Sequence, residues 1–155
     1  MKLYLVQHAR AVDKKADPER PLSAEGVQEV QAIARFFADR PLNVKEIWHS
    51  GKTRARQTAE HLCKTVGSNA KLHTHDGLDP NDDVKPVTRA LRRFDGDLMI
   101  VGHLPWLAKV AALLLSGEED AEPIAFTYAG IVCIERGADD AWRVKWIVVP
   151  ELVAG

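Results

Sequence analysis

The chain has 155 residues, 46% of them apolar and 28% charged, which is typical of a globular domain with one sizeable core. Its formal net charge of −1 argues against nucleic acid or an anionic membrane as a partner, and no apolar run is long enough to span a membrane. The first apolar run is too short for a secretory signal, so we expect a single cytoplasmic domain over residues 1–155. Cys63 and Cys133 lie far apart in sequence, and we expect them in or near the core as reduced thiols.

Apolar runs alternate with helical patterns along the chain. A strand over residues 2–7 is followed by a helix that begins after its cap, Ser23, and ends before Pro41. The next predicted elements are a strand over 44–49, a helix over 53–66, a strand over 71–76, a helix over 84–94, a strand over 97–102 and a helix over 105–115. Two β-rich segments, 130–135 and 142–149, predict an antiparallel hairpin.

This alternation predicts an α/β fold. We expect a three-layer αβα sandwich, with a mostly parallel sheet, antiparallel strands at its C-terminal end and helices on both faces. In such sheets, ligands bind beyond the carboxyl ends of the strands. The residues that follow each strand are therefore the first place to look for a functional site.

Histidines and arginines follow three of the predicted strands. His8 and Arg10 follow the first strand, Ser50 and Arg54 follow the second, and His103 follows the strand over 97–102. Parallel strands would bring these side chains to one edge of the sheet, where helix N-termini also favour anions. The planar fork of arginine suits phosphate oxygens, and a histidine can act as a nucleophile towards phosphorus. The residues predict phosphate chemistry without a metal.

Two other interpretations of these motifs fail on spacing. Residues 51–53, Gly-Lys-Thr, look like the end of a P-loop, but the required glycine five residues earlier is Glu46. His73 and His75 share one face of a predicted strand, which could suit a metal, but no convincing third ligand lies nearby. We therefore interpret both histidines as exposed strand residues.

Several short segments occur together in an order that is specific as a set. They are His8 directly after the first strand, residues 20–23 (Arg-Pro-Leu-Ser) with Gly26, Ser50 with residues 54–59 (Arg-Ala-Arg-Gln-Thr-Ala), residues 78–80 (Leu-Asp-Pro), and residues 102–105 (Gly-His-Leu-Pro). In these segments the chain resembles the histidine phosphatase superfamily, which has the phosphoglycerate mutase-like fold. The resemblance is greatest to its small SixA-type phosphohistidine phosphatases.

The resemblance implies a role for each matching residue. His8 would be the nucleophile that takes the phosphoryl group, and water would then hydrolyse phospho-His8. Arg54 and His103 would hold the phosphoryl oxygens, and Arg20 would reach the same pocket. Gln7, Arg10 and Ser50 are further candidates for phosphate binding. The resemblance implies no cofactor.

The chain departs from the family signature at the end of the first strand. The family has Arg-His-Gly where this chain has Gln7, His8 and Ala9. Alanine can replace the glycine where the backbone angles are ordinary. Glutamine lacks the charge of the arginine, and a hydrogen bond to a charged group contributes about 1.5–3 kcal/mol. Either Arg10 restores the charge, or the site is weakened and binds phosphoryl groups better than it turns them over.

A carboxylic acid protonates the leaving oxygen in many relatives of this kind. Asp79, Asp82 and Asp83 lie in the corresponding region, with Asp79 and Asp83 the main candidates. The other interpretation of these residues is capping of the next helix. Phosphohistidine needs a strong general acid less than a phosphate ester does, because its imidazole can be protonated and leaves readily.

The connections beside the expected site are short and leave no room for a large lid. A shallow site suits a residue presented on the surface of another protein, so we expect a phosphohistidine phosphatase that acts on a phosphotransfer protein. Two alternatives stay open. One is a related phosphomonoesterase that acts on a small phosphomonoester, and the other is a catalytically weak phosphoryl-binding module.

Overall fold

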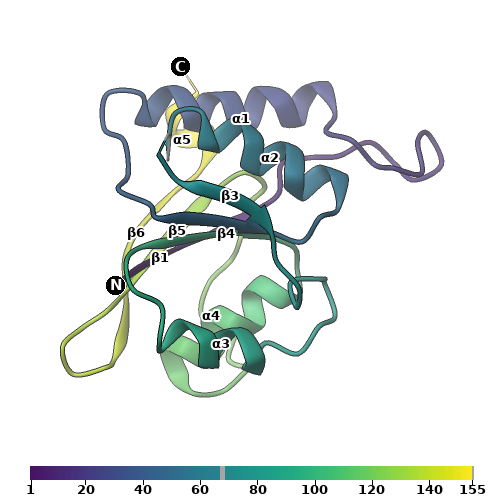
Figure 1. Cartoon of the computed structure of the whole chain (residues 1–155). Coiled ribbons are helices and arrows are strands. Elements are labelled where there is room, and N and C mark those ends of the chain that lie inside the picture. Colours follow the sequence, from purple (N-terminus) through teal and green to yellow (C-terminus); the bar gives the residue numbers. More distant parts are fainter. Residues whose placement is uncertain (67–68, 155) are drawn as a thin grey trace.

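Six strands and five helices alternate along residues 1–66 and 69–154, the part of the chain that the computed structural model describes (Figure 1). In chain order they are β1 (Lys2–Gln7), α1 (Ala24–Phe37), β2 (Glu46–His49), α2 (Thr53–Cys63), β3 (Lys71–Thr74), α3 (Lys85–Leu91), β4 (Leu98–Gly102), α4 (Trp106–Ser116), β5 (Ile131–Arg136), β6 (Trp142–Val148) and α5 (Pro150–Val153). The predicted order is confirmed, and the short helix α5 is an addition that the sequence did not predict. None of these helices is long and apolar enough to cross a membrane.

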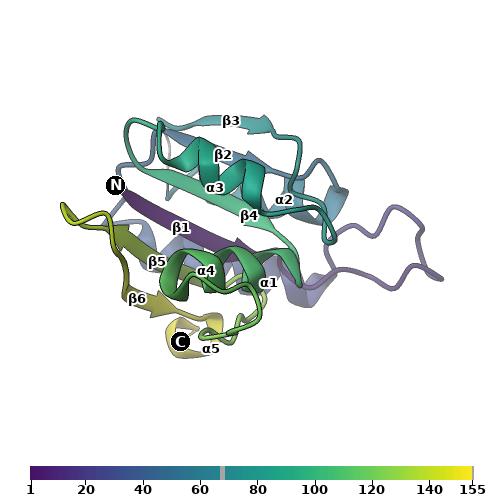
Figure 2. The same cartoon turned by 90° about the horizontal axis from the view of Figure 1, so that it is seen from below.

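The strands form one sheet in the order β3-β2-β4-β1-β5-β6 (Figure 2). Strands β1 to β4 pair in parallel, whereas β5 is antiparallel to both β1 and β6. Helices α1, α2 and α5 cover one face of this sheet, and α3 and α4 cover the other (Figures 1 and 2). The predicted three-layer α/β sandwich is therefore confirmed. Its parallel part brings the carboxyl ends of β1, β2 and β4 to one edge.

The central strands are apolar because both of their faces are covered. Along β1, Leu3 and Leu5 pack on the α3–α4 side, while Tyr4 and Val6 pack on the side of α1 and α2. Strand β4 alternates in the same way and is buried throughout. Burying one such side chain contributes about 1.5–3 kcal/mol. The unbroken apolar runs in these two strands thus follow from helices on both faces.

Some predicted boundaries were wrong by a few residues. The helix predicted to run to Val66 ends at Cys63, and the helix predicted over 84–94 spans Lys85–Leu91. Beyond Leu91, the Phe94 N–H donates to the carbonyl of Leu91 at 3.3 Å, a three-residue spacing that ends the α-helical pattern. Strand β2 begins at Glu46 rather than at residue 44, and β3 ends at Thr74.

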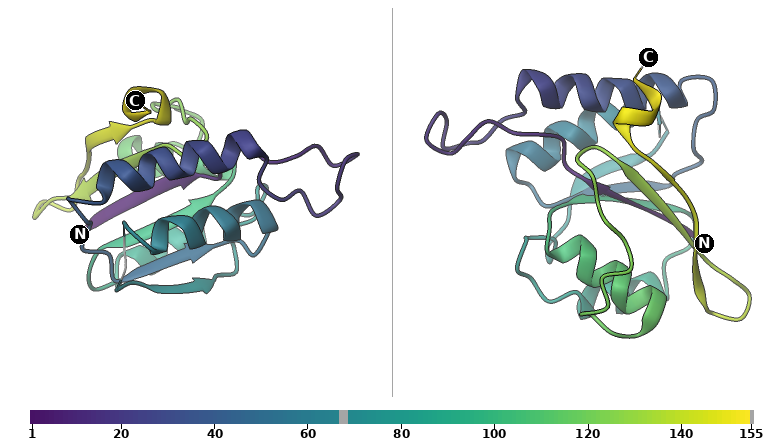
Figure 3. Two further views of the ribbon diagram at one scale, coloured as in Figure 1. Left: turned by 90° about the horizontal axis from the view of Figure 1, so that it is seen from above. Right: turned by 180° about the vertical axis from the view of Figure 1, so that it is seen from behind.

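The connection from β1 to α1 leaves the sheet, projects outward and returns (Figure 3). The base of this loop is closed by hydrogen bonds from the Ser23 N–H to the Arg10 carbonyl and from the Val12 N–H to the Pro21 carbonyl, both 2.9 Å. Gly26 allows the closure, because a Cβ at this position would overlap the carbonyl oxygen of Arg10. The Ser23 hydroxyl caps α1 as predicted, since it accepts the Gly26 N–H at 3.0 Å.

Candidate active site

Two histidines meet where β1 and β4 end side by side. His8 follows the last residue of β1, and His103 follows Gly102, the last residue of β4. The parallel register aligns these ends, and the His8 N–H donates to the Gly102 carbonyl at 3.0 Å. As a result the imidazole ring centres lie 5.1 Å apart, and both side chains are almost completely buried.

The hydrogen bond to His8 fixes which ring nitrogen carries the proton. Nδ1 lies 2.7 Å from the carbonyl oxygen of Ala9, and a carbonyl can only accept, so Nδ1 is the donor. Burial, followed by the positive charges of Arg54 and Arg20, lowers the pKa of His8 to about 4, although the bond to Ala9 acts in the opposite direction. The imidazole is therefore neutral at pH 7, and Nε2 keeps its lone pair.

Ala9 fits the backbone where the family signature has glycine. The φ angle of Ala9 is negative, and its side chain is fully buried in the core beneath α1 and α2. Its N–H donates to Oγ1 of Thr58 at 3.0 Å, and this hydroxyl donates to the Arg54 carbonyl at 2.8 Å. Helix α2 thus holds the peptide whose carbonyl orients His8.

A serine orients the second histidine. Oγ of Ser50 accepts the Lys52 N–H at 3.3 Å and lies 2.6 Å from Nε2 of His103. If the hydroxyl donates its own proton to Nε2, the proton of the neutral His103 ring is on Nδ1. Burial, followed by His8 and Arg54, lowers the pKa of His103 to about 3, which keeps the ring neutral. Ser50 was predicted to bind phosphate, but its described partners are His103 and Lys52.

Two nitrogens in this site have no partner in the described part of the chain. They are Nδ1 of His103 and Nε of Arg54, and both atoms are buried. Arg54 lies in the first turn of α2, and its pKa is lowered by burial and then by Arg20. Buried polar atoms are almost always hydrogen-bonded in folded proteins, so an unpartnered pair beside one histidine indicates a site for an acceptor.

Arg20 reaches this site from the loop between β1 and α1. Its backbone has a φ of 49°, in the left-handed region that an arginine seldom adopts. Its Nε donates to the Val12 carbonyl at 3.2 Å, which directs the side chain across the base of the loop. The charge of Arg20 is among the causes that lower the pKa of His8, Arg54 and His103. Arg20 therefore lies near all three groups.

Arg10 is engaged elsewhere. Its Nε binds Oε1 of Glu29 at 2.6 Å and lies 3.5 Å from Oε1 of Glu25, and its guanidinium lies 4.9 Å from the centre of the Tyr128 ring. Two carboxylates and an aromatic face thus take up the group that was one of the two alternatives for the missing charge. Tyr128, which the sequence analysis missed, also packs 5.7 Å from the His8 ring.

The three aspartates after β3 have different surroundings. Asp79 lies close enough to Arg54 for its charge to favour the charged guanidinium. Asp82 accepts the backbone N–H of Asp79 at 2.9 Å and so closes a turn. Asp83 accepts the N–H of Lys85, the first residue of α3, at 3.0 Å. Asp83 thus has the helix-terminal role that was weighed for it, and Asp79 is the aspartate whose charge acts on the pKa of Arg54.

His73 and His75 both lie beside one tryptophan, Trp48. The His75 ring stacks on Trp48 with ring centres 3.9 Å apart, and Nε2 of His73 lies 3.0 Å from a carboxylate oxygen of Glu46. Among residues 1–66 and 69–154, no group of three or more side chains is arranged to hold a metal ion.

The low pKa values of the two site histidines predict a fall in stability on acidification. The unfolded chain takes up these protons near pH 6.5, whereas the folded chain takes them up only near pH 4 for His8 and pH 3 for His103. Their contribution is complete above about pH 6.5 and is lost as the pH falls towards 4, by about 1.4 kcal/mol per pH unit for each histidine. Urea unfolding from pH 7 to 4 would measure it. His103→Gln should show a shallower slope, and an unchanged slope would contradict the assignment.

The layers and strand order define a fold of the phosphoglycerate mutase-like class. The chain belongs to the histidine phosphatase superfamily (branch 1), whose family model matches residues 3–80. It is 25% identical over 157 residues to phosphohistidine phosphatase SixA of Escherichia coli (strain K12), covering 97% of this chain and 94% of that protein. It is 30% identical over 149 residues to an uncharacterized protein of Picosynechococcus sp., covering 89% and 87%.

Solved structures agree on the fold. The structure of the protein histidine phosphatase SixA complexed with tungstate superposes with a TM-score of 0.81 at 24% identity, covering 98% of this chain and 99% of that one. A putative α-ribazole-5′-phosphate phosphatase from Escherichia coli gives a TM-score of 0.74 at 14% identity, covering 97% and 98%. Membership of this family supports a phosphatase activity for the chain, and its relative SixA of Escherichia coli is a phosphohistidine phosphatase.

Proposed function

We propose that this protein is a metal-independent phosphatase that removes the phosphoryl group from phosphohistidine on a phosphotransfer protein, through a phospho-His8 intermediate. One observation carries the proposal: the His8 ring, whose Nε2 is unprotonated, lies 5.1 Å from the His103 ring, and Nδ1 of His103 and Nε of Arg54 are buried without partners among the described residues. A nucleophile and donors for the surrounding oxygens are the two parts that phosphoryl transfer requires.

The reaction follows from these positions. Nε2 of His8 attacks phosphorus in line with the leaving nitrogen, the new N–P bond forms, and the substrate N–P bond breaks. The released imidazole takes up a proton from solvent. Arg54 and His103 stabilise the charge on the phosphoryl oxygens as the transition state forms. Water then attacks phospho-His8, which releases inorganic phosphate and returns His8 to its neutral form.

Arg20 is the cation that we assign to the place of the missing family arginine. Arg10 is occupied by Glu29, whereas Arg20 acts on both histidines and on Arg54. Gln7 is buried at the end of β1, in register with Gly102, and contributes no charge. The site would therefore work with two arginines, Arg54 and Arg20, and a neutral amide.

Restoring the arginine tests how far this arrangement is weakened. We expect Gln7→Arg to raise kcat by about tenfold, because a charged donor that acts only in the transition state is worth at least about 1.4 kcal/mol. The matched control is Gln7→Met, which keeps the length of the side chain and adds no charge. Steady-state kinetics with one substrate would measure both variants. An unchanged kcat in Gln7→Arg would mean that Arg20 already supplies the full effect.

The assignment of phosphohistidine as the substrate rests on its imidazole leaving group and on the position of the β1–α1 loop. Asp79 is the aspartate whose charge acts on the pKa of Arg54, so it is the candidate acid for a phosphate ester. Phosphohistidine does not need it, because imidazole is a good leaving group once protonated. The loop between β1 and α1 projects away from the sheet (Figure 3), which leaves room for a macromolecular substrate.

A direct comparison of substrates tests the proposal. The protein is incubated with a phosphorylated histidine phosphotransfer domain and, separately, with small sugar phosphates. We expect fast release of phosphate from the domain and slow release from the esters, with Asp79→Asn leaving the former unchanged. Fast ester cleavage that falls in Asp79→Asn, with the domain staying phosphorylated, would instead establish a small-molecule phosphomonoesterase.

A further inference from the structure

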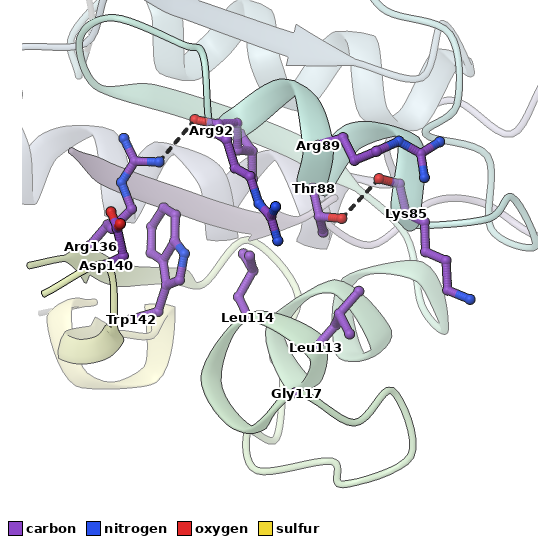
Figure 4. Close-up of a pocket in the computed structure, with 11 residues that line it drawn as sticks. Lys85, Thr88, Arg89, Arg92, Leu113, Leu114, Gly117, Arg136, Asp140 and Trp142 are labelled. Atoms are coloured by element: carbon purple, nitrogen blue, oxygen red, sulfur yellow. Dashed lines mark hydrogen bonds between the residues drawn. The ribbon is translucent and has the colours of Figure 1, made fainter.

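A cavity of about 750 Å³ lies between α3, α4 and the β5–β6 hairpin, away from the histidines (Figure 4). Arg136 lies near the start of β1, because its N–H donates to the Met1 carbonyl at 2.9 Å. His8, by contrast, follows the last residue of β1. The cavity is therefore at the opposite edge of the sheet from the proposed active site, and a ligand in it would not displace a phosphoryl group.

The lining of the cavity is strongly positive. Lys85, Arg89, Arg92 and Arg136 face one carboxylate, Asp140, among the described residues that line it. The chain as a whole has a net charge of −1, so this excess of three positive charges is local. A patch of one sign in a concave site attracts ligands of the other sign.

The cations on and just after α3 have no carboxylate partners among the described residues. Ion pairs hold Arg10, Arg56 and Arg143 at the surface elsewhere, but none includes the cavity's Lys85, Arg89 or Arg92. Lys85 and Arg89 lie four residues apart on α3, and Arg92 follows the last residue of the helix, so the three form one row about 10 Å long. Figure 4 shows Arg92 reaching over Leu114, with Lys85 and Arg89 on one side and Arg136 on the other.

The remaining walls are apolar and include an aromatic ring. Leu91, Leu113 and Leu114 line the floor, and the half-buried indole of Trp142 closes the end at which Arg136 lies, 5.8 Å from the indole centre. A flat aromatic group can pack against such a wall while its charges reach the arginines. The volume is within the range of small-molecule sites, and three elements border it, which suits a small molecule better than a docked helix.

We propose that this cavity binds a small organic polyanion, with its aromatic or apolar body against Trp142 and its negative charges along Lys85, Arg89 and Arg92. A nucleoside triphosphate has this chemistry, because it joins an aromatic base to a row of phosphates of similar length. The ligand class is set by four cations, an apolar floor and one aromatic wall, and it does not depend on the reaction proposed for His8.

The experiment uses ATP as the probe and follows the indole N–H signal of Trp142 by NMR, assigned with Trp142→Phe. The titration is made in about 0.15 M salt, which screens non-specific charge effects, with and without saturating vanadate to fill a phosphoryl site. We expect a saturable shift with a Kd below about 1 mM in both conditions. Inorganic triphosphate and adenosine, each lacking one half of the ligand, should bind at least about tenfold more weakly.

A matched pair of variants completes this test. Arg89→Gln/Arg92→Gln should weaken ATP binding by at least about tenfold, and Arg35→Gln/Arg40→Gln, which removes two arginines from and just beyond α1 on the other face, should not. The proposal would be overturned if the Trp142 signal showed no saturable shift with ATP, or if vanadate removed that shift. It would also be overturned if both double variants weakened ATP binding equally. Inorganic triphosphate binding as tightly as ATP would overturn the role of Trp142.

A separate observation assigns a role to Thr58, which is fully buried on α2. Its hydroxyl oxygen accepts the Ala9 N–H at 3.0 Å, and the Ala9 carbonyl oxygen lies 2.7 Å from Nδ1 of His8. We infer that Thr58 is a positioning residue that fixes the ring orientation and the tautomer of His8. The kinetic part of this inference rests on the proposed function, whereas the tautomer can be measured without turnover.

The test compares Thr58→Val, which keeps the shape and loses the hydroxyl, with Thr58→Ser, which keeps the hydroxyl. Thr65→Val is the control, because the buried Oγ1 of Thr65 has no partner in the described part of the chain. Nitrogen chemical shifts of the His8 ring should show the Nδ1–H form in the wild type, Thr58→Ser and Thr65→Val, and a mixture of both forms in Thr58→Val. We expect kcat to fall about tenfold in Thr58→Val alone. An unmixed Nδ1–H form in Thr58→Val would overturn the inference, whatever its kcat.

Discussion

A His8→Ala variant should fold and lose turnover by at least about a thousandfold, because it lacks the proposed nucleophile. Nε2 of His8 is unprotonated at neutral pH, since Nδ1 binds the Ala9 carbonyl and the pKa of the ring is lowered to about 4. Alanine removes this lone pair and leaves Arg54 and His103 in place. Phosphate release under single-turnover conditions would measure the loss.

The same experiment can trap the intermediate. Acid-labile, base-stable phosphate should appear on His8 in the wild type during turnover and be absent from His8→Ala. His61→Ala, which removes a histidine of α2, is the control and should form the intermediate normally. Residual turnover of His8→Ala near the wild-type rate, or label on another residue, would remove His8 from its proposed role.

Arg54→Ala should lower kcat/KM by about a hundred- to a thousandfold, the usual effect of losing one donor that stabilises a developing charge. Nε of Arg54 is buried and lacks a partner within the described residues, so an incoming phosphoryl oxygen would satisfy it. The guanidinium also lowers the pKa of His8, after burial, so the pKa of His8 should rise in the variant. Histidine titration by NMR would show this second effect.

Arg56 supplies a matched control for this prediction. It is two residues away on α2, and its guanidinium pairs with Glu60 at 3.0 Å on the surface. Arg56→Ala should therefore leave kcat/KM within about twofold of the wild type, since exposed ion pairs contribute little. If both variants lost activity equally, the loss would come from helix α2 rather than from a phosphate contact.

The layers of the fold were predictable because they depend on local patterns. Continuous apolar runs identified β1 and β4, which have helices on both faces, and Ser23 marked the start of α1. The end of α3 was less predictable, because Arg92 and Arg93 are good helix formers by composition. There the chain tightens to three-residue hydrogen bonds as it turns into β4.

The residues of the candidate site that directly follow strands were predictable from the sequence. Tyr128, which a loop brings to the site, was not. His8, Arg54 and His103 were expected together because parallel strands align their carboxyl ends. The two histidine rings lie 5.1 Å apart, and the charge of Arg54 contributes to the lowered pKa of both. Tyr128 precedes β5 in a loop, and only its tertiary pairing with Gln7 brings it beside His8. The direction of Arg10 depends on Glu29 of α1, a contact between distant residues that no local pattern contains.

The β1–α1 loop has a closed base, which we call its neck and which the Ser23–Arg10 and Val12–Pro21 hydrogen bonds hold together, and a free tip. The two parts should differ in how much sequence change they tolerate. Gly26 lets the neck close against Arg10, so any larger residue there would push apart the segment that continues from the proposed nucleophile. Beyond the neck, the tip of the loop projects away from the fold, so changes in its length or sequence do not strain the neck (Figure 1). Insertions at the tip could therefore change which substrate is recognised without moving His8. A single methyl group added at Gly26 would instead displace the residues next to His8 and lower activity.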